Sequence, residues 1–376
     1  MRRMRHYPIR EIIKMNKNQI KSAIAKFKSA DVSIIKDEAL RNKAQNLQAK
    51  QKGFTLLELL VVITLLATIA TAGLVAYEGI GENAQAAASA KNILSAENSI
   101  RNYRALEGEY PNQWDNLTNS TAAAAAADTA GTAPLLAAQT QDFIGTWAMP
   151  IPTGTADGST VMEHAITALN AVGIDEFQTL SADAAVPANF VPNLAWNESA
   201  PKTAGEASEL ELTVDEDGIL DEVAFDETPL TGSAFISIVP SGGNGGCTAD
   251  GITISNDMAG NTESDSSVLN LINDVMGDGD CHLVAAVGFG KDVPGTTFDS
   301  RVAIGIAPTA GSENVNPSEN YARYIALFQL ATTEGPATTA VTAISADDVL
   351  PRARLVAIVD AEGRTLDQAI ANANEN

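Results

Sequence analysis

Cysteine and histidine are scarce in this chain of 376 residues, which contains two cysteines and three histidines. Two cysteines exclude a disulfide-rich scaffold and a four-cysteine zinc site, and three scattered histidines argue against a metal centre built from histidine alone. Aromatic residues make up 5% of the chain, and its net charge is −23. This acidic surplus argues against nucleic acid as a partner, because it repels the phosphate backbone.

Basic residues are scarce in most of the chain but not at its start. Residues 1–53 hold 14 basic and four acidic residues, a net charge of +10, whereas residues 54–376 hold 10 basic and 43 acidic residues, a net charge of −33. The apolar segment at residues 54–77 contains one charged residue, Glu58. A helix of this length spans about 36 Å, enough to cross a hydrocarbon core of about 30 Å. The lysines just before it predict that residues 1–53 stay in the cytoplasm and that the acidic part is exported.

An ordinary signal anchor and a cleavable secretory signal are the two simplest interpretations of this segment. A secretory signal would have a shorter apolar run followed by a small-x-small cleavage site. Neither interpretation explains Glu58, because a carboxylate within an apolar helix costs about 2.5–3.5 kcal/mol on insertion scales and needs a partner or a function. Cleavage after Gly53 would create an α-amino group at Phe54, about one helical turn from Glu58 and attracted to it at low dielectric constant.

One stretch closely resembles the processing motif of type IV prepilins and type II secretion pseudopilins: it reads Gly53-Phe54-Thr55-Leu56-Leu57-Glu58-Leu59-Leu60-Val61-Val62-Ile63. The resemblance implies that a membrane aspartic peptidase, the prepilin peptidase, cuts after Gly53 and methylates the amino group of Phe54. It implies that Glu58 contacts the N-terminal amine of a neighbouring subunit and sets its register. The implied partners are further copies of the chain in a helical filament, the prepilin peptidase, and the pilus or secretion assembly machinery of the inner membrane.

A leader that ends only at Gly53 is long for that family. Either Met4 or Met15 is the true start, or the leader contains a genuine amphipathic helix. Apolar residues recur at helical spacing among its lysines, at Ile20, Ala23, Ile24 and Phe27. The sequence leaves both explanations open.

Helical character continues past the apolar segment and predicts one helix over residues 54–107. Between Ile93 and Leu106 the apolar residues follow one helical face. Gly108, followed closely by a proline, signals the end of the helix. The exit Gly108-Glu109-Tyr110-Pro111 resembles the helix exit of pseudopilins and related pilins.

Beyond residue 205 short apolar runs separated by Gly, Asn, Asp and Pro predict strands. The expected strands are Glu209–Val214, Ala234–Val239, His282–Phe289, Arg301–Ala307, Tyr321–Leu330 and Leu355–Asp360. Short helices are expected at Ala165–Ala171 and Leu366–Asn374. A long helix followed by an antiparallel sheet is an α+β fold, which the resemblance specifies as a pilin-like helix packed on a globular head.

The expected organisation has four parts. Residues 1–53 are a cytoplasmic leader that the prepilin peptidase removes. Residues 54–108 are the long helix, in which residues 54–77 form the transmembrane segment and later the filament core. Residues 109–204 are a variable, loop-rich insertion, and residues 205–376 are a β-rich head.

Cys247 and Cys281 both lie on the expected exported side, where disulfides form and persist. A disulfide between them would close a long loop and stabilise the head by about 3–4 kcal/mol in the chain-entropy model. It would also match the family's habit of cross-linking the C-terminal part of the head. Two free thiols are the alternative.

Carboxylates surround a glycine turn at residues 215–222. The candidate ligands there are Asp215, Asp217, Asp221 and Glu222. Such oxygen ligands suit Ca²⁺, the one cofactor that the sequence suggests, although the distal bidentate Glu of an EF-hand is missing. A solvated acidic turn is the simpler interpretation. The acidic residues between 274 and 280 allow the same two interpretations, a calcium site or a solvated turn.

These features predict a structural subunit of a type IV pilus-like filament, which begins as an inner-membrane precursor and ends in an extracellular or periplasmic filament. A pseudopilin of a type II secretion system is the alternative within the family. An anchored exported enzyme or binding protein is the alternative from another class. No nucleophile elbow, phosphate loop or dinucleotide fingerprint supports catalysis, so we expect that the chain is not an enzyme.

Overall fold

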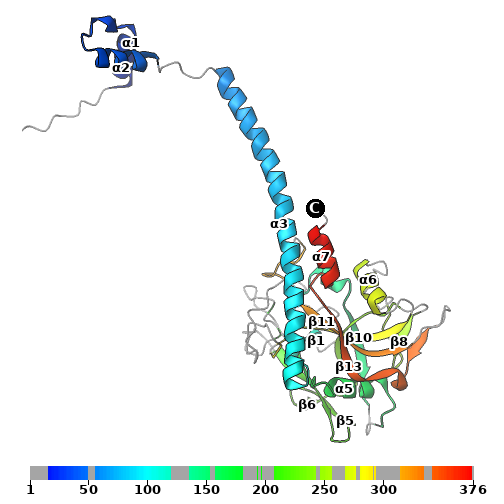
Figure 1. Cartoon of the computed structure of the whole chain (residues 1–376). Coiled ribbons are helices and arrows are strands. Elements are labelled where there is room, and N and C mark those ends of the chain that lie inside the picture. Colours follow the sequence, from blue (N-terminus) through cyan, green and yellow to red (C-terminus); the bar gives the residue numbers. More distant parts are fainter. Residues whose placement is uncertain are drawn as a thin grey trace, which may run out of the picture. The chain divides into compact units, whose positions relative to one another are not determined.

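The computed structural model divides the chain into two compact units, Met1–Tyr77 and Glu78–Asn376 (Figure 1). The structure describes residues 16–49, 56–119, 135–152, 157–180, 193, 196, 207–242, 246–255, 267–276, 280–290, 292–293, 314–333 and 341–374. Gly53, Phe54 and the expected strand Arg301–Ala307 lie outside these residues.

The first unit contains two short helices, α1 (Lys17–Ser29) and α2 (Glu38–Ala49), joined through the 3₁₀ turn η1 (Val32–Ile34). The Gln48 side-chain amide of α2 donates to the carbonyls of Phe27, at 2.7 Å, and Ala30, at 3.1 Å. These carbonyls lie at the C-terminal end of α1, where the last carbonyls lack the usual intrahelical partners, although that of Phe27 also accepts the backbone N–H of Ala30 at 3.4 Å. The two helices therefore form a hairpin closed by a side-chain cap.

The long helix α3 (Leu56–Glu107) has 52 residues and confirms the predicted helix. It ends at the predicted glycine: Gly108 has φ of +85° and donates its N–H to the carbonyl of Arg104 at 2.9 Å. A residue with a side chain is strained in this left-handed conformation, so glycine suits the position after the last turn.

A ten-stranded sheet forms the centre of the second unit (Figure 1). Its main path runs in the order β13-β11-β10-β1-β3-β4-β5-β6, and β7 pairs with both β10 and β2. The strands are β1 (Trp114–Asn119), β2 (Gly145–Pro150), β3 (Glu176–Leu180), β4 (Ala207–Val214), β5 (Leu220–Phe225), β6 (Thr228–Pro229), β7 (Ser233–Val239), β10 (Cys281–Gly288), β11 (Ile325–Thr333) and β13 (Val349–Val359).

A second, three-stranded sheet has the order β12-β8-β9. Its strands are β8 (Cys247–Ala249), β9 (Ile252–Thr253) and β12 (Thr342–Ile344). The remaining helical elements are α4 (Ala138–Gln141), α5 (Val161–Asn170), α6 (Ser267–Met276), the 3₁₀ turn η3 (Ala346–Asp348) and α7 (Leu366–Asn374). Strands β4, β7, β10, β11 and β13 confirm five predicted strands, and α5 and α7 confirm the two predicted short helices.

The prediction of an antiparallel sheet is confirmed only in part, because most strand pairs are antiparallel but the sheet is mixed. Strands β1 and β3 run parallel, as do β12 and β8 in the smaller sheet. The connection from β1 to β3 contains α5, and a parallel pair needs such a long crossover rather than a tight turn. The fold is nevertheless a mixture of helix and sheet, as the sequence predicted.

The prediction of a loop-rich insertion at residues 109–204 also needs correction, because the described part of it contributes β1, β2 and β3 to the large sheet. All six residues of β1 are buried, although four of them are polar. Burial on both faces removes the alternation of apolar and polar residues that identifies a half-exposed strand. The sequence signal for β1 was therefore missing.

The second part of α3 belongs to the core of the second unit. Ala90, Ile93 and Ile100 are buried in the same apolar cluster as Trp114 and Phe328. The rings of Trp114 and Phe328 meet edge to face, with centroids 5.2 Å apart. The helix thus supplies one face of the core of this second unit, Glu78–Asn376, which is called the head from here on. In Figure 1 this part of the helix runs along the head beside β11 and β1.

Candidate functional site

The candidate site is the first part of α3, an apolar stretch at Leu56–Leu74. Its mean hydropathy is 2.2, and no part of it is buried. Its exposed large apolar side chains are Leu56, Leu57, Leu59, Leu60, Val61, Val62, Ile63, Leu65, Leu66, Ile69 and Leu74. Because these positions surround the helix on all sides, the stretch requires burial in lipid or among other protein chains.

The threonines of this stretch satisfy their own hydroxyl groups. Thr64 donates to the carbonyl of Val61, and Thr68 donates to that of Leu65, each at 2.9 Å. Thr71 donates in the same way to the carbonyl of Ala67. An unsatisfied donor in hydrocarbon costs several kcal/mol, so these local bonds make the threonines compatible with lipid.

Glu58 lies in the first turn of α3 and is exposed. The free amide groups at a helix N-terminus favour a carboxylate there. Gly53 and Phe54, the predicted processing residues, lie outside the described residues, so the distance from Glu58 to them is not defined. Glu58 lies within the exposed apolar stretch, and its predicted role in assembly stays a prediction.

The exit of α3 is held firmly against the head. The Arg104 guanidinium lies over the Tyr110 ring, 4.5 Å from its centroid, and its Nη1 donates to the Tyr110 hydroxyl at 2.6 Å. The buried Tyr110 ring meets Phe328 edge to face at 5.1 Å. The short turn after Gly108 therefore joins α3 to the sheet through a packed aromatic contact.

A hydrogen bond also ties the middle of α3 to the loop before α7. Ser89 donates its hydroxyl to Asp360 Oδ2 at 3.2 Å, and Arg364 Nε reaches the same carboxylate oxygen at 2.8 Å. The other oxygen, Oδ1, accepts the backbone N–H groups of Glu362 and Arg364. Asp360 is fully buried, so this network fixes the helix to the C-terminal part of the head.

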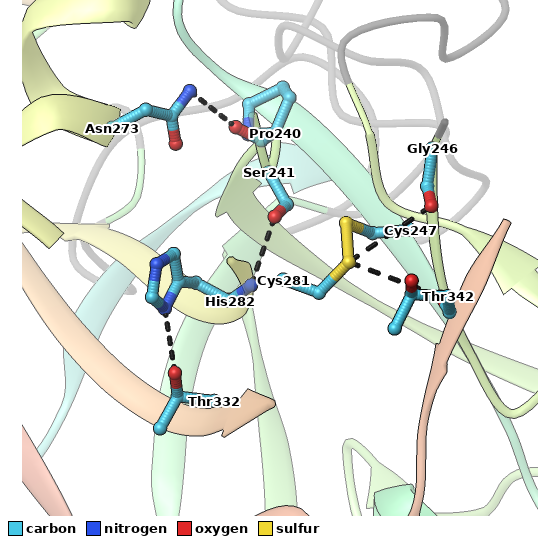
Figure 2. Close-up of a disulfide and its surroundings, with 9 residues drawn as sticks. All are labelled: Pro240, Ser241, Gly246, Cys247, Asn273, Cys281, His282, Thr332 and Thr342. Carbon is cyan, nitrogen blue, oxygen red and sulfur yellow. Dashed lines mark hydrogen bonds between the residues drawn. A yellow bond between two sulfur atoms is a disulfide. The ribbon is translucent and has the colours of Figure 1, made fainter. Parts of the chain in front are cut away.

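The predicted disulfide between Cys247 and Cys281 is confirmed (Figure 2). It joins β8 of the small sheet to β10 of the large sheet, and both cysteines are fully buried. Closing a loop of this length stabilises the folded head by about 3–4 kcal/mol in the chain-entropy model. The bond therefore acts as a structural link between the two sheets.

His282, next to this disulfide, is held by local polar contacts. Its backbone N–H donates to the Ser241 hydroxyl at 2.9 Å, and its Nδ1 lies 3.0 Å from the Thr332 hydroxyl (Figure 2). The imidazole is buried. Within the described part of the chain it belongs to no group of three or more metal-ligating side chains.

The predicted calcium ligands are not brought together. Asp215 Oδ1 accepts the backbone N–H groups of Asp217, at 3.0 Å, and Ile219, at 2.8 Å, so this carboxylate closes the turn between β4 and β5. Asp221 and Glu222 are consecutive exposed residues of β5, and consecutive side chains of a strand point to opposite faces. No group of three or more His, Cys, Asp or Glu suited to a metal occurs among the described residues.

A buried ion pair inside the sheet was not predicted. Arg323 Nη1 lies 3.2 Å from Asp115 Oδ2, which also accepts the Tyr321 hydroxyl at 2.8 Å. Arg323 Nη1 donates to the carbonyl of Phe289 as well, at 2.6 Å. Burial raises the pKa of Asp115 to about 6, although the charge of Arg323 opposes the shift. The two partners lie far apart in the sequence, and no local pattern could have revealed them.

Comparison with known proteins adds one match. Residues 48–74 match the family described as the prokaryotic N-terminal methylation motif, the signature of type IV prepilins and pseudopilins. The match covers the predicted processing residues, Glu58 and the exposed apolar stretch of α3. No curated protein and no solved structure matches the chain. The motif implies processing by prepilin peptidase, and it points to a structural protein.

Proposed function

Starting from this prepilin signature, we propose that the chain is a structural subunit of a type IV pilus-like filament. It is cut after Gly53, methylated at Phe54, and assembled through the N-terminal stretch of α3. One observation supports this most strongly: the stretch inside the matched motif exposes all its large apolar side chains, while the later part of the same helix is built into the core of the head. Such a helix can exchange lipid for neighbouring helices while the head stays folded.

The physics of that exchange gives Glu58 its proposed role. Moving an apolar side chain from lipid to a helix interface changes its hydrophobic free energy little, because lipid tails are as apolar as leucine. Apolar packing alone therefore distinguishes poorly between neighbouring registers. A carboxylate paired with the new amine of Phe54 in another subunit interacts strongly at low dielectric constant. This charge pair selects the register.

The proposed precursor spans the inner membrane with its leader in the cytoplasm. The mature subunit then occupies a surface or periplasmic filament with further copies of itself. Its partners in processing and assembly are the prepilin peptidase and the inner-membrane assembly machinery. The motif and the single described helix long enough to cross a membrane support this route.

A pseudopilin of a type II secretion system is the second candidate. The helix exit favours it, because the Gly108-Glu109-Tyr110-Pro111 segment resembles that of pseudopilins. Both candidates require the same processing and helix packing. They differ in the filament that the subunit builds, which is a surface pilus in the first candidate and the pseudopilus of a secretion system in the second.

Mass spectrometry of the mature N-terminus tests the processing step, which both candidates require. We expect N-methyl-Phe54 as the first residue, and an intact leader or a cut far downstream would contradict the proposal.

Glu58→Ala should be processed normally yet assemble at least tenfold less filament, measured by fractionation. The matched control is Glu107→Ala, which removes the same charge from the exposed C-terminal end of α3 and should assemble normally.

Shearing cells and deleting the gene separate the two candidates. Recovery of the chain in sheared surface filaments supports a pilus. Its absence from that fraction, together with loss of protein secretion in the deletion strain, supports a pseudopilus. Normal filament yield from Glu58→Ala would contradict the register role in either case.

A further inference from the structure

The segment that the proposed function only discards, residues 16–49, is a structured pair of helices. Gln48 of α2 caps the C-terminal carbonyls of α1, so the two helices fold against each other. None of residues 16–48 is buried, however. A hairpin of this size without a buried side chain gains too little from its own contacts to offset its conformational entropy. It requires another surface.

The α1 helix presents the side chains that such a surface would contact. Ile20, Ile24 and Phe27 follow one face at i, i+4 and i+7, and each remains more than 40% exposed. Leu40 and Leu47 of α2, and Ile34 between the helices, are more than half exposed. The hairpin therefore displays apolar groups that its own packing leaves in water.

Lysines border this apolar face along one edge. Lys17, Lys21 and Lys28 lie there, next to Ile24. The helix contains no acidic residue. A lysine at such a boundary lays its apolar stem along the surface while its ammonium reaches out, so this arrangement suits an interface between hydrocarbon and negative charge.

We propose that α1 lies on the cytoplasmic leaflet of the membrane, its apolar face among the acyl chains and its lysines on the phosphates of anionic phospholipids. Charge complementarity supports this partner, since each lysine near an anionic surface contributes about 1 kcal/mol. Continuity of the chain supports it as well. Ala49 and Leu56 are joined by six residues, which reach at most about 25 Å, so the hairpin stays near the start of the membrane-spanning stretch.

That short tether makes a weak contact sufficient. It gives the hairpin an effective concentration in the millimolar range at the bilayer surface, so a helix of modest affinity is largely bound. Cleavage after Gly53 removes the tether, and the released leader then dissociates. The contact therefore holds the uncut site at the membrane surface and ends when the cut is made. Starts at Met4 and at Met15 both leave α1 intact.

The inference rests on the membrane insertion in the proposed function, but not on filament assembly.

A fluorescent probe on the full-length precursor tests it, because the native cysteines are joined in a disulfide and an added cysteine can be labelled alone. Ile24→Cys places a polarity-sensitive fluorophore on the apolar face. Ser22→Cys places it on the opposite face of the same helix and is the matched control. The precursor is reconstituted into vesicles of pure phosphatidylcholine and into vesicles in which phosphatidylglycerol replaces about a third of that lipid.

At low salt we expect at least a threefold higher emission from position 24, with a blue shift, only in the vesicles with phosphatidylglycerol. The change should disappear in 1 M salt and in the triple variant Lys17→Gln, Lys21→Gln, Lys28→Gln, and position 22 should respond little. An unchanged probe at position 24 in a precursor that resists alkaline extraction overturns this inference alone, as does an equal change in both vesicle types. A precursor that alkaline extraction removes overturns the insertion step and this inference together.

Discussion

The two parts of α3 share one backbone conformation but have opposite surroundings. In the stretch Leu56–Leu74 every described side chain is exposed, whereas Ala90, Ile93 and Ile100 lie in the core of the head. The first part is apolar on all sides, and the second part carries an apolar stripe on a polar helix. Helix formation is therefore common to both parts, and the distribution of apolar residues around the axis decides whether a part packs on its own head or requires an apolar medium outside the subunit.

Breaking the buried ion pair tests how far the stability of the head is independent of the exposed stretch. Arg323→Met leaves Asp115 as an uncompensated buried charge and should lower the free energy of unfolding of the head by about 3–5 kcal/mol. Denaturant titration of the detergent-solubilised chain, followed by near-ultraviolet circular dichroism, measures it. Membrane insertion should be unchanged.

Arg101→Met is the matched control for that variant. Arg101 pairs with Glu97 on the surface of α3, one turn away, and its side chain is 70% exposed. Such a pair contributes about 0.3–0.5 kcal/mol. A loss as large as that of Arg323→Met would contradict the importance of burial.

The same substitution made in each part of α3 separates what the two parts contribute to the stability of the head. Ile100→Ala removes a fully buried side chain and should destabilise the head by about 2–5 kcal/mol. Ile63→Ala removes the same atoms from a side chain that is 57% exposed, and the head should unfold at the same denaturant concentration as before. Equal losses at the two positions would show that the exposed stretch contributes to folding of the head.

A further expected effect is a dependence on pH that belongs to the head alone. Burial raises the pKa of Asp115 to about 6, above the ordinary value of about 4 that it regains on unfolding. Between these values the folded head binds more protons than the unfolded chain, so the contribution of Asp115 to stability falls as the pH rises through that window.

Asp115→Asn should remove this contribution. The difference in unfolding free energy between the original chain and the variant should therefore fall from pH 4 to pH 6 and level off above it. Taking the difference cancels the titration of the many other carboxylates. A difference that stays constant over this window would contradict the raised pKa of Asp115.

Features with a local signal could be predicted from the sequence. The apolar run, the helical periodicity that continues beyond it, and Gly108 predicted α3 and the place where it ends correctly. Helix periodicity and termination depend on neighbouring residues, so both leave a local signal. Five strands after residue 205 were found for a similar reason, because clusters of Gly, Asn, Asp and Pro separate their short apolar runs. The processing motif is also a local pattern, and its match at residues 48–74 needs no tertiary information.

Features that depend on distant residues could not be predicted. Strand β1 is mostly polar and yet entirely buried. Its polar side chains find partners on other strands, since Asn116 bonds to Ser237 of β7 and to Thr179 of β3. The ion pair of Asp115 and Arg323 likewise joins segments that meet only in the folded sheet. In the acidic turn the composition suggested calcium, but the alternation along β5 separates Asp221 from Glu222, and composition contains no such directional information.

The inward bonding of Thr64, Thr68 and Thr71 has a consequence for the freedom of the subunit to rotate. With these hydroxyls turned back onto the backbone, the threonines add no polar stripe to the side of the stretch. Rotation of the helix about its own axis would then change little in what a neighbouring helix meets. In the proposed filament, Glu58 would fix how far along the axis one subunit sits beside the next, and contacts between the heads would have to set the direction in which each subunit faces.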